Sequence, residues 1–254
     1  MENLALKLIL TPALIGAVSL AGRRWGPGVS GWLVGLPLTS GPVALFLALD
    51  HGTAFAAGAA RGILAGVVAL ITFTLSYAWL AFALDWRLAL AASWGVFFTT
   101  TAVMHQLSVP VLPMYLVACS LLLILLRLLP RKMSAGAPAI PPAWDLPLRM
   151  VVATAFVLLL TGLAPRLGPQ VSGLLAPFPI FASVLGAFTH RLQGAPAAAR
   201  LFRGLTLGMF AFASFFLVVG LLIERAGVAV TFLAASVVAV AVQGGTLLLV
   251  RGRG

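Results

Sequence analysis

The sequence is divided into apolar blocks of about 18 to 22 residues, the length of a helix that spans the ~30 Å hydrocarbon core of a bilayer. Short segments with charges, glycines and prolines separate the blocks. Only 8% of the residues are charged, against about 25% in a soluble domain, so the chain lacks the polar surface that a soluble fold of this length needs. The pattern predicts an all-α polytopic membrane protein with the lipid bilayer as its partner.

Nine blocks have this length and composition. They cover residues 3–22, 30–49, 61–83, 88–107, 110–129, 147–164, 172–190, 201–223 and 228–250. The first block resembles a signal sequence, but Lys7 interrupts it and its end is repeated later in the chain, so we expect it to be retained. The one long connection, 130–147, is rich in Pro and Ala and is predicted to be irregular.

The two halves of the sequence align without a gap when Arg24 is placed on Arg166 and this register is kept. RRWGPGVSGWLVGLP at 23–37 then falls on PRLGPQVSGLLAPFP at 165–179, and 15 of the 43 positions from 24 to 66 are identical to their counterparts. Shared Leu and Ala are expected by chance, but the shared patterns Gly-Pro-x-Val-Ser-Gly and Arg-Gly-x-x-x-Gly are not. Such self-similarity predicts an internal duplication.

The unmatched block 110–129 lies between two four-helix repeats. The predicted units are therefore a first repeat at 1–108, a linker helix and cytoplasmic loop at 109–146, and a second repeat at 147–254. One extra crossing inverts the second repeat, and twelve Lys and Arg residues then fall on one side against four on the other. The positive-inside rule places the N-terminus outside and the C-terminus in the cytoplasm.

A re-entrant 110–129 would give eleven against five, so the charges barely separate these two arrangements. The length and apolarity of the block favour nine crossings. Inverted repeats are a recurring architecture of secondary transporters.

The aligned core, with GVSGWLVGLPLTSGP in the first repeat and QVSGLLAPFPIFAS in the second, resembles the small four-helix inner-membrane proteins of the GlpM-like group. The similarity covers roughly 45 residues of each half and suggests two such units fused through a linker helix. It implies a location in the bacterial inner membrane, and it transfers no functional residues to this chain.

The second helix of each repeat carries the strongest candidate site. Ser30 and Ser172 open these helices and are expected to cap them. The prolines that follow are Pro37 and Pro42 in one copy, and Pro177 and Pro179 in the other. A proline frees the carbonyl four residues before it, here those of Leu33, Leu38, Gly173 and Leu175. Paired interrupted helices point to a transporter site, with Pro37, Thr39, Ser40, Pro179 and Ser183 as its residues, although ordinary proline kinks would give the same sequence.

Two further pairs match in the same register. Arg61 and Arg203 are expected at the start of the third helix of each repeat, either as snorkelling headgroup anchors or as cationic gates for an anionic or phosphate-bearing substrate. Gly62 and Gly66, repeated as Gly204 and Gly208, have the small-xxx-small spacing that lets helices approach closely, within the chain or in a homodimer.

No Asp or Glu lies near the centre of a predicted span, which argues against carboxylate proton coupling. Asp50 and His51 are expected to end the second helix on the outer side, with His51 either as a solvated loop residue or as a proton relay. The sequence has no phosphate-binding glycine loop and no metal or nucleophile constellation, so no enzyme activity, cofactor, metal or nucleic-acid partner is predicted. Two hypotheses remain: a small secondary transporter or lipid-precursor translocase, and a non-transporting scaffold that binds another membrane protein.

Overall fold

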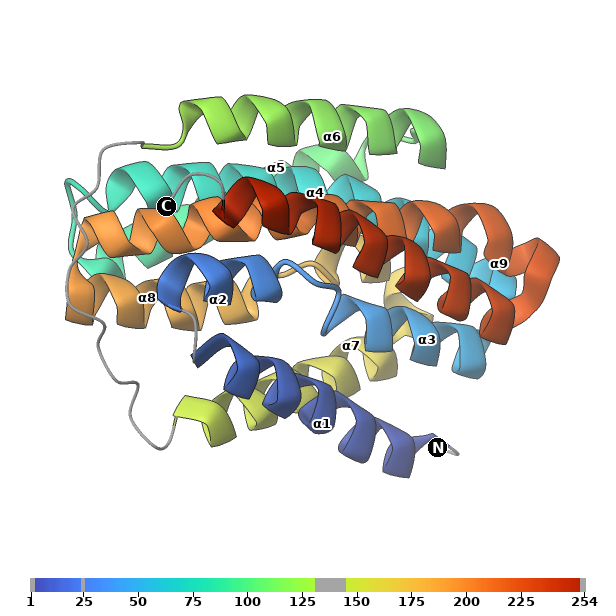
Figure 1. Cartoon of the computed structure of the whole chain (residues 1–254). Coiled ribbons are helices and arrows are strands. Elements are labelled where there is room, and N and C mark those ends of the chain that lie inside the picture. The colour runs from blue at the N-terminus through green and yellow to red at the C-terminus, as the bar shows by residue number, and fades with distance from the viewer. Residues whose placement is uncertain (1–2, 24–25, 131–144, 252–254) are drawn as a thin grey trace.

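The computed structural model describes residues 3–23, 26–130 and 145–251, and their secondary structure is helical throughout (Figure 1). The helices are α1 (Leu4–Arg23), α2 (Gly26–Val34), α3 (Ser40–His51), α4 (Thr53–Leu80), α5 (Trp86–His105), α6 (Val111–Leu128), α7 (Asp145–Leu175), α8 (Ile180–Gln193) and α9 (Ala195–Arg251). Arg24, the linker segment 131–144 and the side chain of Ser30 lie outside the described residues.

Two of the helices are bent at glycines. The chain leaves helical geometry at Gly168 in α7, with φ 74°, and at Gly227 in α9, with φ 73°. Glycine reaches positive φ without the steric penalty that a Cβ imposes, so each bend falls at a residue that permits it. The chain of α9 reverses at its bend (Figure 1), and its two arms contain the predicted helices 201–223 and 228–250.

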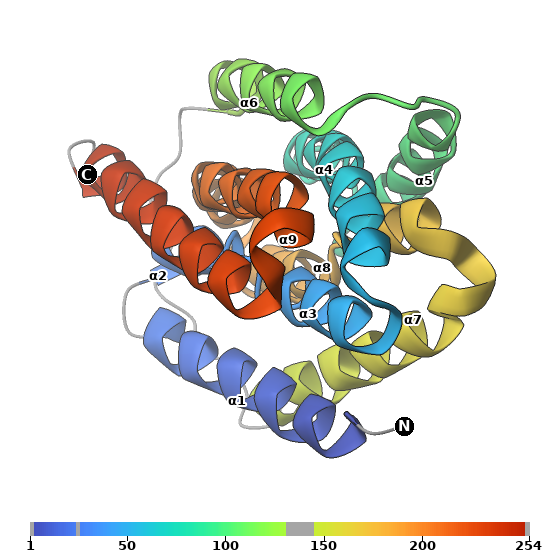
Figure 2. The ribbon, with the colours of Figure 1, turned by 90° about the vertical axis from the view of Figure 1, so that its right-hand side faces the viewer.

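Five helical stretches are long and apolar enough to cross a membrane, with mean hydropathies of 1.3 to 2.4. They are Thr53–Leu80, Trp86–His105, Val111–Leu128, Leu146–Leu175 and Ala195–Thr246. The most apolar part of α4 is 72% buried and that of α9 is 67% buried, whereas that of α5 is 22% buried. The first arm of α9 and α4 therefore form the centre of the bundle, with α1, α5, α6 and α7 around it (Figure 2).

The centre is held by two close approaches of glycine to backbone. A Cβ on Gly31 in α2 would lie 2.8 Å from the carbonyl carbon of Leu201 in α9. A Cβ on Gly173, near the end of α7, would lie 2.9 Å from the carbonyl carbon of Ala59 in α4. In the register that aligns the two halves, Gly31 corresponds to Gly173 and Ala59 to Leu201. Helix α2 therefore packs on the first arm of α9 as the second arm of α7 packs on α4.

The predicted starts of the third helices are wrong. The helix of the first half begins at Thr53 and that of the second at Ala195, because Gly52 and Gly194, with φ of 86° and 82°, form the breaks and the Ala-rich segments that follow are helical. Arg61 and Arg203 consequently lie about two turns inside their helices.

Three of the glycines suggested for a homodimer pack against other helices of the same chain. Gly62 and Gly66 pack against the backbone around Leu174, and Gly208 packs against Gly35. Ser172, expected to cap a helix, lies inside α7. Gly62, Gly66 and Gly208 thus serve close helix packing inside one chain.

Candidate functional site

The two proline-containing segments are interrupted, and the interruptions meet. The first separates α2 from α3 over residues 35–39, and the second separates α7 from α8 over residues 176–179. The Ser40 hydroxyl donates a buried hydrogen bond of 2.7 Å to the carbonyl of Ala176. This bond joins the start of α3 to the second interruption, so two segments distant in sequence are fixed to one another in the core.

The expectation that the interruptions free backbone carbonyls is wrong at three of the four positions. The carbonyl of Leu33 accepts from the Leu36 amide at 3.1 Å, that of Gly173 from the Ala176 amide at 3.2 Å, and that of Leu175 from the Phe178 amide at 2.9 Å. The chain tightens into i→i+3 turns before each break, which is a common way to satisfy groups at a helix end. The core therefore avoids unpaired carbonyls at these positions.

A small cavity of about 40 Å³ lies between the interruptions, and Thr39, Ser40 and Pro179 are among its lining residues. A buried water needs about 10–15 Å³ of such volume, so the space suits a few waters and not a substrate. Ser183 has a side-chain partner of its own: its hydroxyl accepts a 2.9 Å hydrogen bond from the Trp94 indole. The Pro37 carbonyl accepts from the Gly41 amide at 2.8 Å.

The two matched arginines have unequal surroundings. The Arg203 guanidinium donates to the carbonyl of Leu126 at 3.1 Å, near the C-terminal end of α6, where a positive charge is favourable. Arg61 is exposed and lines a separate cavity of about 220 Å³ beside Ser108 and Gln170. Helix α6 has no counterpart in the aligned register, and it meets the two arginines differently. Its Leu126 carbonyl binds Arg203, whereas Met114 near its start lines the cavity of Arg61.

A cavity of about 790 Å³ lies where the start of α1, the end of α3 and the first arm of α7 meet. We call it the α1–α3–α7 cavity. Its polar lining comes from Asn3, Lys7, Asp50, His51 and Thr161. The prediction that Asp50 and His51 end a helix is confirmed. Both belong to the last turn of α3, where the His51 side chain is half-buried and the Asp50 side chain is 24% exposed.

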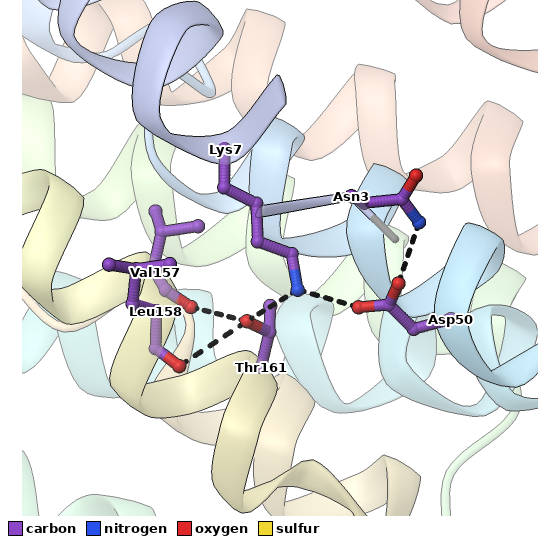
Figure 3. Close-up of polar contacts among 6 residues, drawn as sticks. All are labelled: Asn3, Lys7, Asp50, Val157, Leu158 and Thr161. Carbon is purple, nitrogen blue, oxygen red and sulfur yellow. Dashed lines mark hydrogen bonds and ion pairs between the residues drawn. The ribbon is translucent and has the colours of Figure 1, made fainter. Parts of the chain in front are cut away.

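An ion pair dominates this cavity (Figure 3). The Lys7 ammonium lies 2.6 Å from one carboxylate oxygen of Asp50 and donates to the Thr161 hydroxyl at 3.1 Å. The Asn3 amide donates to the other carboxylate oxygen at 2.7 Å. The Lys7 and Asp50 side chains are 12% and 24% exposed, and Asp50 as a whole residue is exposed, so the pair is only partly removed from water.

The sequence alone did not link Lys7 to Asp50, because the two residues belong to different predicted helices and both lie at block ends. One signal was present: the predicted topology places both residues on the outer side, and two opposite charges at similar depth are candidates for pairing. Thr161 gave no such signal, since a hydroxyl in an apolar helix usually bonds to its own backbone, as this one also does to Val157.

The described residues contain no group of three or more His, Cys, Asp or Glu side chains placed to hold a metal ion. A helical bundle with five membrane-length apolar helices and an apolar exterior is a helical integral membrane protein. No protein-family model, curated protein or solved structure matches this chain.

Proposed function

We propose that this chain is a small secondary transporter or lipid-precursor translocase of the bacterial inner membrane, with its substrate path between the two interrupted segments. The observation that carries the proposal is the contact of these segments through Ser40 and Ala176. Interrupted helices that meet near mid-membrane at the interface of two repeats are typical of transporter sites.

The proposal includes nine crossings and two inverted repeats, with the N-terminus outside. Seven crossings are formed by α1, α4, α5, α6, the first arm of α7 and the two arms of α9. Helix α2 with α3 forms one more crossing across the first interruption, and the second arm of α7 with α8 forms another across the second, which gives the predicted number. Support for the repeats comes from their local geometry: Gly52 and Gly194, which are equivalent in the aligned register, share a positive φ of 86° and 82°. The reciprocal contacts of Gly31 and Gly173 add a second, tertiary correspondence.

The cavity of about 40 Å³ corresponds to a closed state under this proposal. A substrate larger than a few waters requires the interruptions to separate, and alternating access by movement of one repeat against the other would provide this. Helices α3 and α8 are the elements expected to move, because each is short and is bounded by an interruption on one side and a positive-φ glycine on the other.

Fewer residues support an anionic or phosphate-bearing substrate than the sequence suggested. Arg203 is engaged by a carbonyl of α6, so a symmetric pair of cationic gates is not part of the proposal. Arg61 alone remains as an exposed cation beside a cavity, and it suits an oxyanion on chemical grounds.

A second function, that of a scaffold subunit, is favoured by the tight closure of the core. Backbone contacts at Gly31 and Gly173 leave no room for a Cβ, and a bundle with so little internal space could act by binding another membrane protein. The scaffold needs no opening of the interruptions, whereas the transporter does, and this difference separates the two functions without knowledge of the substrate.

The test uses thiol accessibility in a background with Cys119→Ser, because Cys119 is the only cysteine. Thr39→Cys places a thiol in the wall of the small cavity. A transporter predicts labelling by a membrane-impermeant maleimide from both sides of oriented vesicles. Thr74→Cys, at a fully buried position of α4, is the matched control and should stay unlabelled. Labelling of Thr39→Cys from one side only, or from neither, rejects the transport proposal and favours the scaffold.

A further inference from the structure

The α1–α3–α7 cavity has the dimensions of a small-molecule site. Its volume of about 790 Å³ falls within the range of about 300–1,000 Å³ that is usual for ligand pockets. Three helices from both halves of the chain form it, and its lining combines apolar side chains such as Leu158 with the polar group around Lys7 and Asp50. Apolar walls with a few convergent polar groups are the usual composition of a binding site.

The ion pair in this cavity contributes little to the stability of the fold. Asp50 is exposed and Lys7 is half-buried, and ion pairs of this exposure usually add about 0–1 kcal/mol. Stability of the bundle therefore does not account for the pairing of Lys7 and Asp50, and both charged groups can be reached from the cavity.

Both charged groups retain unused hydrogen-bonding capacity. The Lys7 ammonium has three donors; it contacts two acceptors, those of Asp50 and Thr161, and lies 5.2 Å from the centre of the Phe46 ring. The carboxylate has about four acceptor positions, and Lys7 and Asn3 each fill one. Because both residues line the cavity, the remaining positions are available to a ligand.

His51 forms part of the wall beside the ion pair. Its ring lies 4.9 Å from that of Phe55. Its Nε2 atom is buried, without a hydrogen-bond partner among the described residues, and therefore does not open into the cavity. The groups that a ligand in the cavity can reach are those of Lys7 and Asp50.

The charges of the lining decide which ligand fits. The described lining residues carry one cation, Lys7, and one anion, Asp50, with His51 counted as neutral. A ligand with a single net charge would be attracted by one group and repelled by the other, whereas a ligand with both charges satisfies both. We propose that the α1–α3–α7 cavity binds a small zwitterion, with its anionic oxygens on Lys7 and its ammonium on Asp50.

This inference goes beyond the transport proposal and does not require it. Ligand binding in the cavity without labelling of Thr39→Cys would support the binding site and reject the transport proposal. Labelling of Thr39→Cys without ligand binding would support transport and reject the binding site. A primary ammonium joined to an oxyanion occurs both in free amino acids and in ethanolamine phospholipid headgroups, so the experiment needs one arm for each source.

The first arm measures thermal unfolding of the full chain in phosphatidylglycerol nanodiscs. Glycine, β-alanine and O-phosphoethanolamine are the zwitterionic probes, and acetate, methylamine and inorganic phosphate are the singly functional controls. At a concentration about 100-fold above its Kd, a ligand lowers the unfolded-to-folded ratio about 100-fold. We expect at least one zwitterion to raise the Tm and the three controls to leave it unchanged.

The second arm replaces part of the lipid with phosphatidylethanolamine and repeats the measurement without soluble probes. A rise in Tm here, with no response to the soluble probes, assigns the site to a lipid headgroup. A response to the soluble probes assigns it to a free solute. No response in either arm, or an equal response to zwitterions and controls, overturns the proposal.

Variants connect the response to the ion pair. Lys7→Gln and Asp50→Asn should each weaken binding about tenfold or more, because each removes a charge-assisted contact. The double variant Lys7→Met/Asp50→Leu removes both charges together, so it guards against misfolding from one unpaired charge, and it should fold and give no response. Arg225→Gln, which removes an exposed charge outside the cavity, should respond as the wild type does. Unchanged binding in the double variant would overturn the site.

Discussion

Replacement of Gly173 by alanine tests the packing that holds the two halves together. The new Cβ would lie 2.9 Å from the carbonyl carbon of Ala59 and 2.9 Å from the Cα of Gly62, where ordinary contacts begin at 3.4 Å. Both obstacles are backbone atoms, so no side-chain rotation relieves the overlap, and α7 and α4 must separate. A gap of roughly 0.5–1 Å forfeits about a quarter to a half of each dispersion contact along the interface.

The expected loss of stability is about 1–3 kcal/mol, the range for overpacked sites. The assay is equilibrium unfolding in mixed micelles with increasing dodecyl sulfate, followed by tryptophan fluorescence. Gly95→Ala is the control, because a Cβ at Gly95 in α5 meets nothing within 4 Å, and it should gain up to about 1 kcal/mol from helix propensity. Gly31→Ala should cost as much as Gly173→Ala. Equal stability of Gly173→Ala and Gly95→Ala would refute the packing argument.

Three further outcomes are expected. Ser40→Ala should destabilise the protein by about 1 kcal/mol in the same assay, because the Ala176 carbonyl loses its buried donor; no change would show that the contact contributes nothing. Arg203→Gln should lower the Tm and speed proteolysis at the end of α6, whereas Arg61→Gln should stay within about 0.5 kcal/mol of the wild type; equal effects would contradict the asymmetry described above. Topology reporters at the C-terminus and in the linker between α6 and α7 should both report the cytoplasm, and a periplasmic signal from either contradicts the proposed orientation.

The proline breaks were predictable because their cause is local. A proline removes one amide donor and displaces a carbonyl wherever it lies in a helix, so the sequence at Pro37 and Pro179 predicted both interruptions. The same local rule did not separate them from Pro12 and Pro165, which lie inside α1 and α7. The hydrogen bonding at the interruptions was less predictable. Whether a carbonyl is left free depends on how the preceding turn tightens, and at Leu33 and Gly173 the backbone itself provides the partner.

Contacts between distant segments could not be derived in the same way. The gapless alignment of the halves suggests that Arg61 and Arg203 are equivalent, but it contains no information on where the unmatched helix α6 packs. Since α6 offers a C-terminal carbonyl to Arg203, the pair becomes unequal. The pairing of Lys7 with Asp50 likewise depends on the relative placement of α1 and α3, which periodicity does not encode.

Helix α3 connects the two candidate sites of the molecule. Ser40 at its first turn holds the second interruption, and Asp50 at its last turn holds Lys7. Its 12 residues form a rod of about 18 Å at 1.5 Å per residue, too short to bend between its ends. The interruption before it and Gly52 after it are the points at which backbone angles can change. A displacement of α3 that opens the cavity beside Thr39 is therefore expected to move Asp50 relative to Lys7. A ligand that separates this ion pair would likewise displace α3. The two proposals together predict that ligand binding in the α1–α3–α7 cavity and opening at the interruptions are coupled through this one short helix.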